Sequence, residues 1–402
     1  MATLLTLGLV MLLAGGLLEY GQWRFDQVPK VHVLGLTPAP RSTPKAPSQA
    51  FNILSIGSDS RAGLSGSVAA QTGAGSVSGS RSDVVKIIHV DPSVPSVTIL
   101  SIPRDTMVSL LANQSLFTNY NRINVNYGNG PSLLVRTITA NFGIPISHVI
   151  QVSFGGIINT ADAIGGVYLN FPYPAKDAYS GLNITHAGCQ LVTGFQALAI
   201  ARSRHYQYLQ NGVWMYDGTS DYGRIVRQNV FVEALLKRAE HSYNPLTVNT
   251  LLSNLPQGIT IDDRLTLSDL VGLAYRFRHF SPSVIKTYTL PTISTGYVAP
   301  YGDVLFPNPS ADYALLRQIF GNSLLTPTNP PPSPRLVPTW PSVTTTTTTS
   351  QPVATTTTIT PPTTTPSTTV ASRPTQTTPS TTSTTTTTIP TSQLSYFDPT
   401  VC

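Results

Sequence analysis

The chain has 402 residues, a net charge of +6 and a charged fraction of only 10%, compared with about 25% in an average soluble domain. Its two cysteines exclude a disulfide-rich scaffold and a metal site built from a cysteine cluster. The eighteen arginines, against six lysines, favour bidentate binding of phosphate or carboxylate, although a GC-rich genome produces the same bias. The chain has no basic runs interleaved with aromatic residues, which argues against nucleic acid as a partner.

An apolar segment opens the chain. Residues 4–18 are apolar apart from Thr6, which is barely the length that a membrane-spanning helix needs. We expect residues 1–20 to form a single-pass anchor, and a cleaved signal peptide is the alternative. No Lys or Arg precedes the segment, so we also expect the true start of the chain to lie upstream. Either reading predicts a cell-membrane location with the remaining chain outside the cytoplasm.

Composition divides the rest of the chain into three parts. Residues 21–50 are rich in proline and are expected to be a linker, whereas residues 51–325 have a globular pattern. Residues 326–402 are rich in Thr, Ser and Pro and are expected to form a disordered tail. Its end, "LSYFDPTVC", is aromatic and apolar again, which predicts that the tip docks. Cys402 either pairs with Cys189 or frays while Cys189 is buried.

Short strands alternate with helices in the globular part. We expect strands at 51–57, 83–91, 96–102 and 148–154, of which the second and third form a hairpin. We expect helices at 131–143, 155–166, 193–201, 223–240, 266–277 and 311–320. Thr193 and Gln196 have the spacing of a capping box. The alternation predicts an α/β fold in which helices cover both faces of a sheet.

Charged residues gather where these elements begin and end. They are Asp59 after the first strand, Arg81 and Asp83 at the second, Arg104 and Asp105 after the third, Arg202 and Arg204 after helix 193–201, and Asp221, Arg224, Arg227 and Gln228 around the start of helix 223–240. A hairpin brings the start of strand 83–91 and the end of strand 96–102 to the same edge. We therefore expect Arg81 and Asp83 to lie close to Arg104 and Asp105.

Arginines and aspartates in one place indicate a particular chemistry. Arginines donate to phosphate oxygens, and aspartates would repel a phosphate unless a divalent cation lay between them. The set therefore predicts a metal-assisted pyrophosphate site and phosphoryl transfer. Solvated surface pairs are the simpler explanation for any one Arg–Asp pair, but five groups in a chain so poor in charge favour a site.

Several motifs appear in an order that resembles the LytR-CpsA-Psr family of bacterial envelope proteins. They are "NILSIGSDSR", "SRSDVVKIIHVD", "VTILSIPRDTMV", "NRINVNYGNGPSLLVRTI", "VSFGGIINTADAIGGV" and "GFQALAIARSRH…DYGRIVRQNVFVEALL". The resemblance is strong over residues 51–240 and weaker to about 325. It implies a three-layer α/β/α sandwich with a mixed central sheet and an apolar pocket for a prenyl chain. It also implies a membrane-anchored phosphotransferase that moves a glycopolymer from a polyprenyl-pyrophosphate carrier to peptidoglycan.

The resemblance further implies roles for individual residues. Asp59 and Asp83 would hold Mg²⁺, or alternatively Mn²⁺. The pyrophosphate would be bound by Arg81, Arg104, Arg202, Arg204, Arg224 and Gln228. Asp105 and Asp221 would orient these arginines or help to deprotonate the acceptor hydroxyl. The partners would be a polyprenyl-pyrophosphate-linked glycan, peptidoglycan and the membrane. A polyprenyl-pyrophosphate hydrolase and a non-catalytic prenyl-lipid-binding wall protein remain the alternatives.

Overall fold

The computed structural model describes residues 16, 19–39, 49–60, 82–93, 96–111, 119–240, 245–276, 285–334 and 394–402. Most of the expected anchor, Arg81 and the greater part of the expected tail lie outside these ranges. Within them, none of the helices combines the length and the apolar character required to cross a bilayer.

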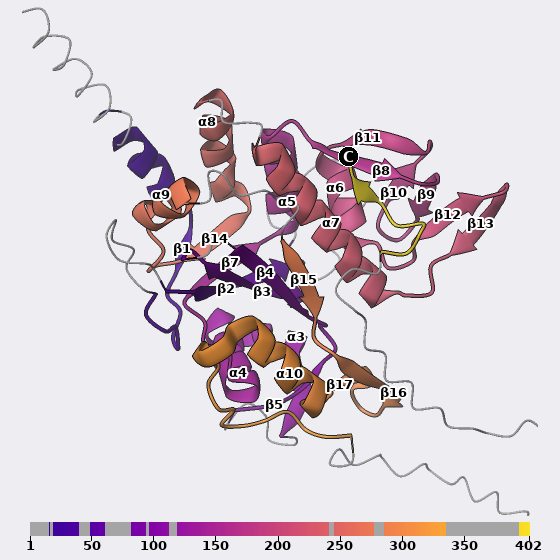
Figure 1. Cartoon of the computed structure of the whole chain (residues 1–402). Helices are drawn as coiled ribbons and strands as arrows, with labels where there is room; N and C mark the ends of the chain where they lie inside the picture. Colours follow the sequence, from indigo (N-terminus) through magenta and orange to yellow (C-terminus); the bar gives the residue numbers. More distant parts are fainter. Residues whose placement is uncertain are drawn as a thin grey trace, which may run out of the picture.

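A seven-stranded sheet forms the centre of the molecule (Figure 1). Its strands follow the order β1 (Lys30–Val31), β14 (Ile259–Asp262), β7 (His148–Val152), β2 (Phe51–Ser58), β3 (Ser82–Asp91), β4 (Ser96–Ile102) and β15 (Lys286–Thr289). The middle strands β2, β3 and β4 are antiparallel, whereas β7 is parallel to β2 and β15 is parallel to β4. The sheet is therefore mixed, and the expected hairpin of β3 and β4 is confirmed.

One face of the sheet is densely packed. The register aligns two rows of three apolar residues across β2, β3 and β4, namely Leu54, Ile87 and Leu100, and Ile56, Val85 and Ile102. These rows pack against α3 (Ile123–Asn126), α4 (Pro131–Phe142) and α10 (Pro309–Phe320). The helix α4 begins at Pro131 and ends before Gly143, whose φ of 69° suits a residue without a Cβ.

The opposite face carries shorter and more polar side chains. The register aligns Ser55, Lys86 and Ser101 across the same three strands. The helices on this side are α5 (Phe154–Ala163), α6 (Gly194–Arg202), α7 (Asp221–Glu240) and α8 (Pro245–Asn254) (Figure 1). Helices thus cover both faces, as predicted, and the short serine side chains leave a cavity between the sheet and α5–α7.

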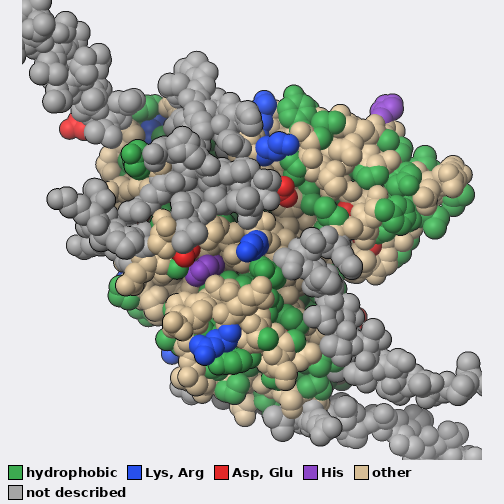
Figure 2. Space-filling model, viewed as in Figure 1, with side chains coloured by type: hydrophobic (Ala, Val, Ile, Leu, Met, Phe, Trp, Pro, Cys, Tyr) green, Lys and Arg blue, Asp and Glu red, His purple; other side chains and the backbone are tan. Residues whose placement is uncertain are grey.

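Smaller sheets extend beyond α6 and α7. One contains β8 (Val167–Phe171), β11 (Gly188–Val192) and β18 (Thr400–Val401), and another contains β9 (Ala175–Asp177), β10 (Leu182–Ile184), β12 (Gln207–Gln210) and β13 (Val213–Tyr216). Hydrophobic side chains gather over this end of the molecule (Figure 2), where all four residues of β13 are exposed. Two further strand pairs are β5 (Met107–Ser109) with β6 (Tyr120–Arg122) and β16 (Thr292–Val298) with β17 (Gly302–Pro307). The other helices are α9 (Leu267–Arg276) and the short 3-10 helices η1 (Tyr127–Asn129), η2 (Leu255–Gln257) and η4 (Gly321–Ser323).

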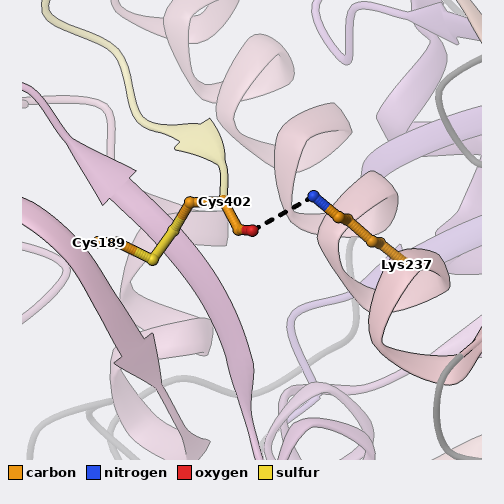
Figure 3. The surroundings of a disulfide bond; sticks show 3 residues. All are labelled: Cys189, Lys237 and Cys402. Carbon is orange, nitrogen blue, oxygen red and sulfur yellow. Dashed lines mark hydrogen bonds between the residues drawn. A yellow bond between two sulfur atoms is a disulfide. The ribbon is translucent and has the colours of Figure 1, made fainter.

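The last residues of the chain fold back onto the domain. The strand β18 pairs with β8, and Cys402 forms a disulfide with Cys189 (Figure 3). The carbonyl of Cys402 accepts a hydrogen bond of 3.2 Å from Lys237 Nζ on α7. Phe397 stacks on Tyr208 with ring centroids 4.4 Å apart. The structure therefore confirms that the tip docks, and of the two alternatives for Cys402 it shows the disulfide.

The folded domain begins earlier than the composition indicated. Residues 19–26 are helical, and Lys30–Val31 add β1 to the edge of the central sheet. Phe25 and Val28 are buried in a cluster with Ile261 and Leu265. Apolar side chains that precede the first proline, Pro29, thus pack against Ile261 of β14 and the neighbouring Leu265, so that part of the expected linker belongs to the domain.

Two expectations about local structure were wrong. The side chain of Thr193 makes no capping bond, and Gln196 instead hydrogen-bonds to the backbone of Gly181 and Asn183. The strand expected at 148–154 ends at Val152, because Ser153 accepts a bond from the amide of Gly156 and starts α5. Gln196 therefore bonds to a neighbouring segment rather than to its own helix start, and the N-cap at Ser153 ends the strand earlier than expected.

Candidate functional site

A cavity of about 410 Å³ lies between the central sheet and α5–α7. One part of its lining is apolar and includes Val152, Ile157, Phe231, Leu235 and Ile259. Another part is charged and includes Asp83, Arg104, Arg202, Arg204 and Arg224. The cavity therefore offers both apolar surface and arginine side chains to a bound molecule.

Asp83 and Arg104 meet at the edge of the sheet, as the hairpin predicted. The register of β2 and β3 shifts between the pairs Gly57–Val84 and Ser58–Ser82, so that Asp83 is an extra residue in a bulge. Arg104 ion-pairs with its carboxylate. Burial opposes ionisation of Asp83, but the nearby arginines outweigh burial and hold its pKa below the usual range.

Asp105 connects three arginines that come from different parts of the chain. Its carboxylate oxygens lie 3.3 Å from Arg104 Nε, 3.4 Å from Arg122 Nη1 and 4.0 Å from Arg204 Nη2. Arg122 was not among the residues expected in the site, although it stands in the motif "NRINVNYGNGPSLLVRTI" of the family resemblance. These contacts suit a residue that orients guanidinium groups.

Asp221 makes a similar connection at the start of α7. Its Oδ1 lies 2.6 Å from Arg204 Nη2 and 2.7 Å from Arg224 Nη2. Arg224 also donates a hydrogen bond of 2.8 Å to the backbone carbonyl of Asp83 and is 4% exposed. Gln228, one turn further along α7, donates to the carbonyl of Ala201 at 2.8 Å. The two residues line the cavity and also tie α7 to β3 and α6.

Hydrogen bonds to the side chain of Asp177 hold the segment from Arg202 to His205 in place. The helix α6 ends at Arg202, and Ser203 is extended with φ −63° and ψ 118°. The buried Asp177 carboxylate accepts from Ser203 Oγ at 2.8 Å and from the amides of Arg204 and His205 at 3.0 Å. Sequence reasoning missed Asp177, and the only available signal was the turn-forming pattern "DAYSG" that follows β9.

Arg227 belongs beside the site rather than in it. Its side chain is fully buried, and Nη1 lies 2.8 Å from both Asp217 and Asp398. Its Nη2 donates to the carbonyl of Ser203 at 3.1 Å. Asp398 comes from the docked C-terminal segment, so residues far apart in the chain hold the backbone between Arg202 and Arg204.

Asp59 follows β2 directly, at the same edge of the sheet as Asp83. The pair Ser58–Ser82 separates the two positions, and Ser58 lines the cavity. Within the described ranges, no group of three or more His, Cys, Asp and Glu side chains is placed to hold a metal ion. Two carboxylates nevertheless fit Mg²⁺, which commonly binds one or two carboxylates together with substrate phosphates and water. Arg81, expected here as well, lies outside the described residues.

Lys86 is a buried cation on the cavity floor. Its Nζ donates to Ser101 Oγ at 2.8 Å and to Asn229 Oδ1 at 2.6 Å. Burial, and to a lesser extent repulsion from Arg224, lowers the pKa of Lys86 to about 7. The sequence suggested no site role for Lys86, although the motif "SRSDVVKIIHVD" contains it, because a lone lysine in an apolar strand resembles a solvated edge position.

Replacing Lys86 with methionine is expected to weaken the pH dependence of stability above neutral pH. An unfolded lysine keeps its proton up to about pH 10.4, whereas the folded chain releases it near pH 7. The unfolded state then binds more protons, so the wild type gains stability as pH rises through this window. Urea unfolding at about pH 6 and about pH 9 measures how much the unfolding free energy of each protein changes between the two pH values. The exposed Lys286 supplies the control Lys286→Met, and an equal pH dependence in Lys86→Met and wild type would contradict the prediction.

Comparisons with known proteins agree on one family. The sequence profile of the LytR_cpsA_psr family matches residues 30–304. The chain is 32% identical over 270 residues to the probable cell wall biosynthesis protein LcpB of Corynebacterium glutamicum, covering 66% of this chain and 59% of that protein. It is 28% identical over 216 residues to the polyisoprenyl-teichoic acid–peptidoglycan teichoic acid transferase TagU of Halalkalibacterium halodurans, covering 54% and 62%. The matches thus span about 60% of the length of these relatives.

The fold is also similar to solved structures. A LytR-Csp2A-Psr enzyme from Actinomyces oris superposes with a TM-score of 0.54 at 24% identity. The superposition covers 76% of this chain and 99% of that one. This likeness shows a shared fold, with the mixed central sheet described above.

Proposed function

The chain belongs to the LytR-CpsA-Psr family, and we propose that it is a phosphotransferase that moves a glycopolymer from a polyprenyl-pyrophosphate carrier to peptidoglycan. The observation that carries the proposal is the cavity, whose lining joins apolar side chains to Arg104, Arg202 and Arg204. A prenyl chain fits the apolar part, and a pyrophosphate fits guanidinium groups that present planar pairs of donors.

The proposed reaction transfers one phosphoryl group together with its glycan. An acceptor sugar hydroxyl forms a bond to the phosphorus next to the glycan. The bond between that phosphorus and the bridging oxygen breaks, so prenyl phosphate leaves with the electron pair, and the hydroxyl proton passes to solvent. Arg104, Arg202 and Arg204 stabilise the negative charge that develops on the phosphate oxygens. Asp105 and Asp221 hold the arginine side chains in place.

We propose Mg²⁺ as the cofactor, with Asp59 and Asp83 as its protein ligands. The support is that the two residues lie on either side of the Ser58–Ser82 pair in the register of β2 and β3, and that Arg104 ion-pairs with Asp83. The ion would neutralise charge on the phosphates when bound.

We propose that the catalytic domain lies outside the cytoplasm, anchored through residues 1–20, and that the Thr-rich segment serves as a disordered stalk. The Cys189–Cys402 disulfide supports this location, because disulfides persist in oxidising compartments. The apolar run at residues 4–18 supports the anchor.

A transfer assay tests the proposal. Full-length protein in detergent is given a polyprenyl-pyrophosphate-linked glycan labelled in the sugar, peptidoglycan and Mg²⁺, and label in the insoluble wall is counted. We expect label to enter the wall with release of prenyl phosphate. Soluble glycan phosphate without wall label would instead identify a hydrolase, and lipid binding without turnover would identify a carrier protein.

A further inference from the structure

A second cavity, of about 300 Å³, lies at the edge of the central sheet. It is formed where β2 and β7 end and β14 begins, and Tyr127 of η1 contributes to its wall. The two cavities share Ser58 and Ile259. A molecule bound in the second cavity would therefore be next to a molecule bound in the first.

The second cavity differs from the first in its chemistry. Its described lining contains no charged side chain. Pro256 and Ile259 add apolar surface to a set of polar side chains, namely those of Ser58, Ser60, Tyr127, Gln151, Ser153, Gln257 and Thr260. The Tyr127 hydroxyl donates to Gln151 Oε1 at 2.6 Å, which leaves the Gln151 NH₂ group as a donor. Hydroxyl and amide groups both donate and accept, as the hydroxyls of a saccharide require. A phosphate would instead need cationic partners.

The position of the second cavity suits an attacking group. In phosphoryl transfer the attacking and leaving oxygens are roughly in line with phosphorus. The proposed donor places its leaving prenyl phosphate in the first cavity, so the acceptor must approach from a neighbouring space. Asp59 lies between Ser58 and Ser60, which both line the second cavity. Asp83, the other candidate metal ligand, lines the first cavity. The two candidate ligands are thus carried by segments that border the two cavities.

We propose that the second cavity binds the uncharged sugar of the acceptor glycan. This inference rests on the proposed function, because it names where the second substrate of that reaction binds. Size supports it, since 300 Å³ falls at the lower end of the range of small-molecule sites.

Direct binding of an acceptor fragment tests the inference without requiring turnover. The probe is a soluble, uncross-linked glycan strand from peptidoglycan, titrated calorimetrically into the full-length protein. The double variant Gln151→Met/Thr260→Val removes two polar groups that are neighbours in register on β7 and β14. Because the double variant loses two hydrogen bonds to the glycan, we expect its dissociation constant for the glycan to rise about tenfold or more. Gln257→Ala, at an exposed lining residue, is a second variant with little risk to folding.

Matched controls separate the possible outcomes. Gln318→Met breaks a comparable glutamine–tyrosine contact, with Tyr288, on the far side of the sheet and should leave the binding unchanged. Affinity for a short prenyl pyrophosphate, measured in parallel, should also be unchanged in the cavity variants. Unaltered glycan binding in both cavity variants, absence of binding by the wild type, or an equal loss of prenyl pyrophosphate binding would overturn the inference. The cavity variants could bind the glycan more weakly than the wild type while the wild type transfers no label to the wall. That result would support the binding site and would count only against the proposed function.

Discussion

Replacing Arg204 with alanine is expected to lower the rate of glycan transfer about 10²–10³-fold, the loss typical of removing one electrostatic donor from a transition state. Arg204 lines the cavity, and its guanidinium group contacts both Asp105 and Asp221. The substitution removes the cation and also releases the two carboxylates that orient neighbouring arginines. The transfer assay with labelled donor, at saturating donor and acceptor, measures the effect on kcat.

Two further variants make this result specific. Arg204→Lys keeps the charge but loses the planar pair of donors, so an intermediate rate is expected. Arg317→Ala removes an exposed arginine from α10, on the opposite face of the sheet, and should transfer at the wild-type rate. An Arg204→Ala enzyme within about threefold of wild type would contradict the assignment of the phosphate-binding cluster.

Replacing Arg227 with methionine is expected to cost about 3–5 kcal/mol of unfolding free energy, the usual effect of removing one partner from a buried ion pair. The change leaves the buried carboxylates of Asp217 and Asp398 without their cation and removes the bond to the Ser203 carbonyl. Burial raises the pKa of Asp398. Protonation of Asp398 in the variant would relieve the repulsion between the two carboxylates, so the loss should be larger at about pH 7.5 than at about pH 5. Urea unfolding monitored by circular dichroism measures both values.

The matched control is Asp398→Asn. The amide oxygen can still accept from Arg227, and Asp217 still balances the guanidinium charge. Burial already raises the pKa of Asp398 despite the opposing effect of Arg227, so the loss of its charge should cost little. If Asp398→Asn destabilised the protein as much as Arg227→Met, the loss of charge balance would not explain the lower unfolding free energy of Arg227→Met.

The same comparison tests how the C-terminal segment affects the site. Arg227 joins Asp398 to the carbonyl of Ser203, which lies between Arg202 and Arg204. Because the substitution would move this backbone, Arg227→Met should also lose transfer activity under conditions in which it remains folded. The segment 394–402 would then position the site although it contributes no residue to the cavity lining that the structure describes.

Local patterns in the sequence were sufficient for most of the central elements. Short apolar segments predicted β2, β3 and β4, and the short connection between β3 and β4 predicted their antiparallel pairing. The pairing in turn placed Asp83 beside Arg104. These inferences succeeded because strand periodicity and hairpin geometry depend on residues that are close in sequence.

Other parts of the site depend on contacts that no local pattern encodes. The sequence suggested no site role for Asp177, Arg122 or Lys86, because each acts through contacts with other segments of the chain. Arg122 and Lys86 do stand within motifs that resemble the family, but the motifs by themselves did not indicate what these side chains contact. Arg227 stands one residue before Gln228, yet the packing of α7 buries it against Asp398 from the C-terminus.

The sequence by itself determined the alternation of strands and helices, the family, and the edge of the sheet at which the charged residues gather. Only the tertiary structure decided which arginines face a cavity, which arginine contacts which carboxylate, and that Cys402 pairs with Cys189 rather than fraying. The physical reason is that burial and charge pairing arise from the packing of helices against the sheet. That packing brings together side chains whose separation along the chain carries no information about their distance in space.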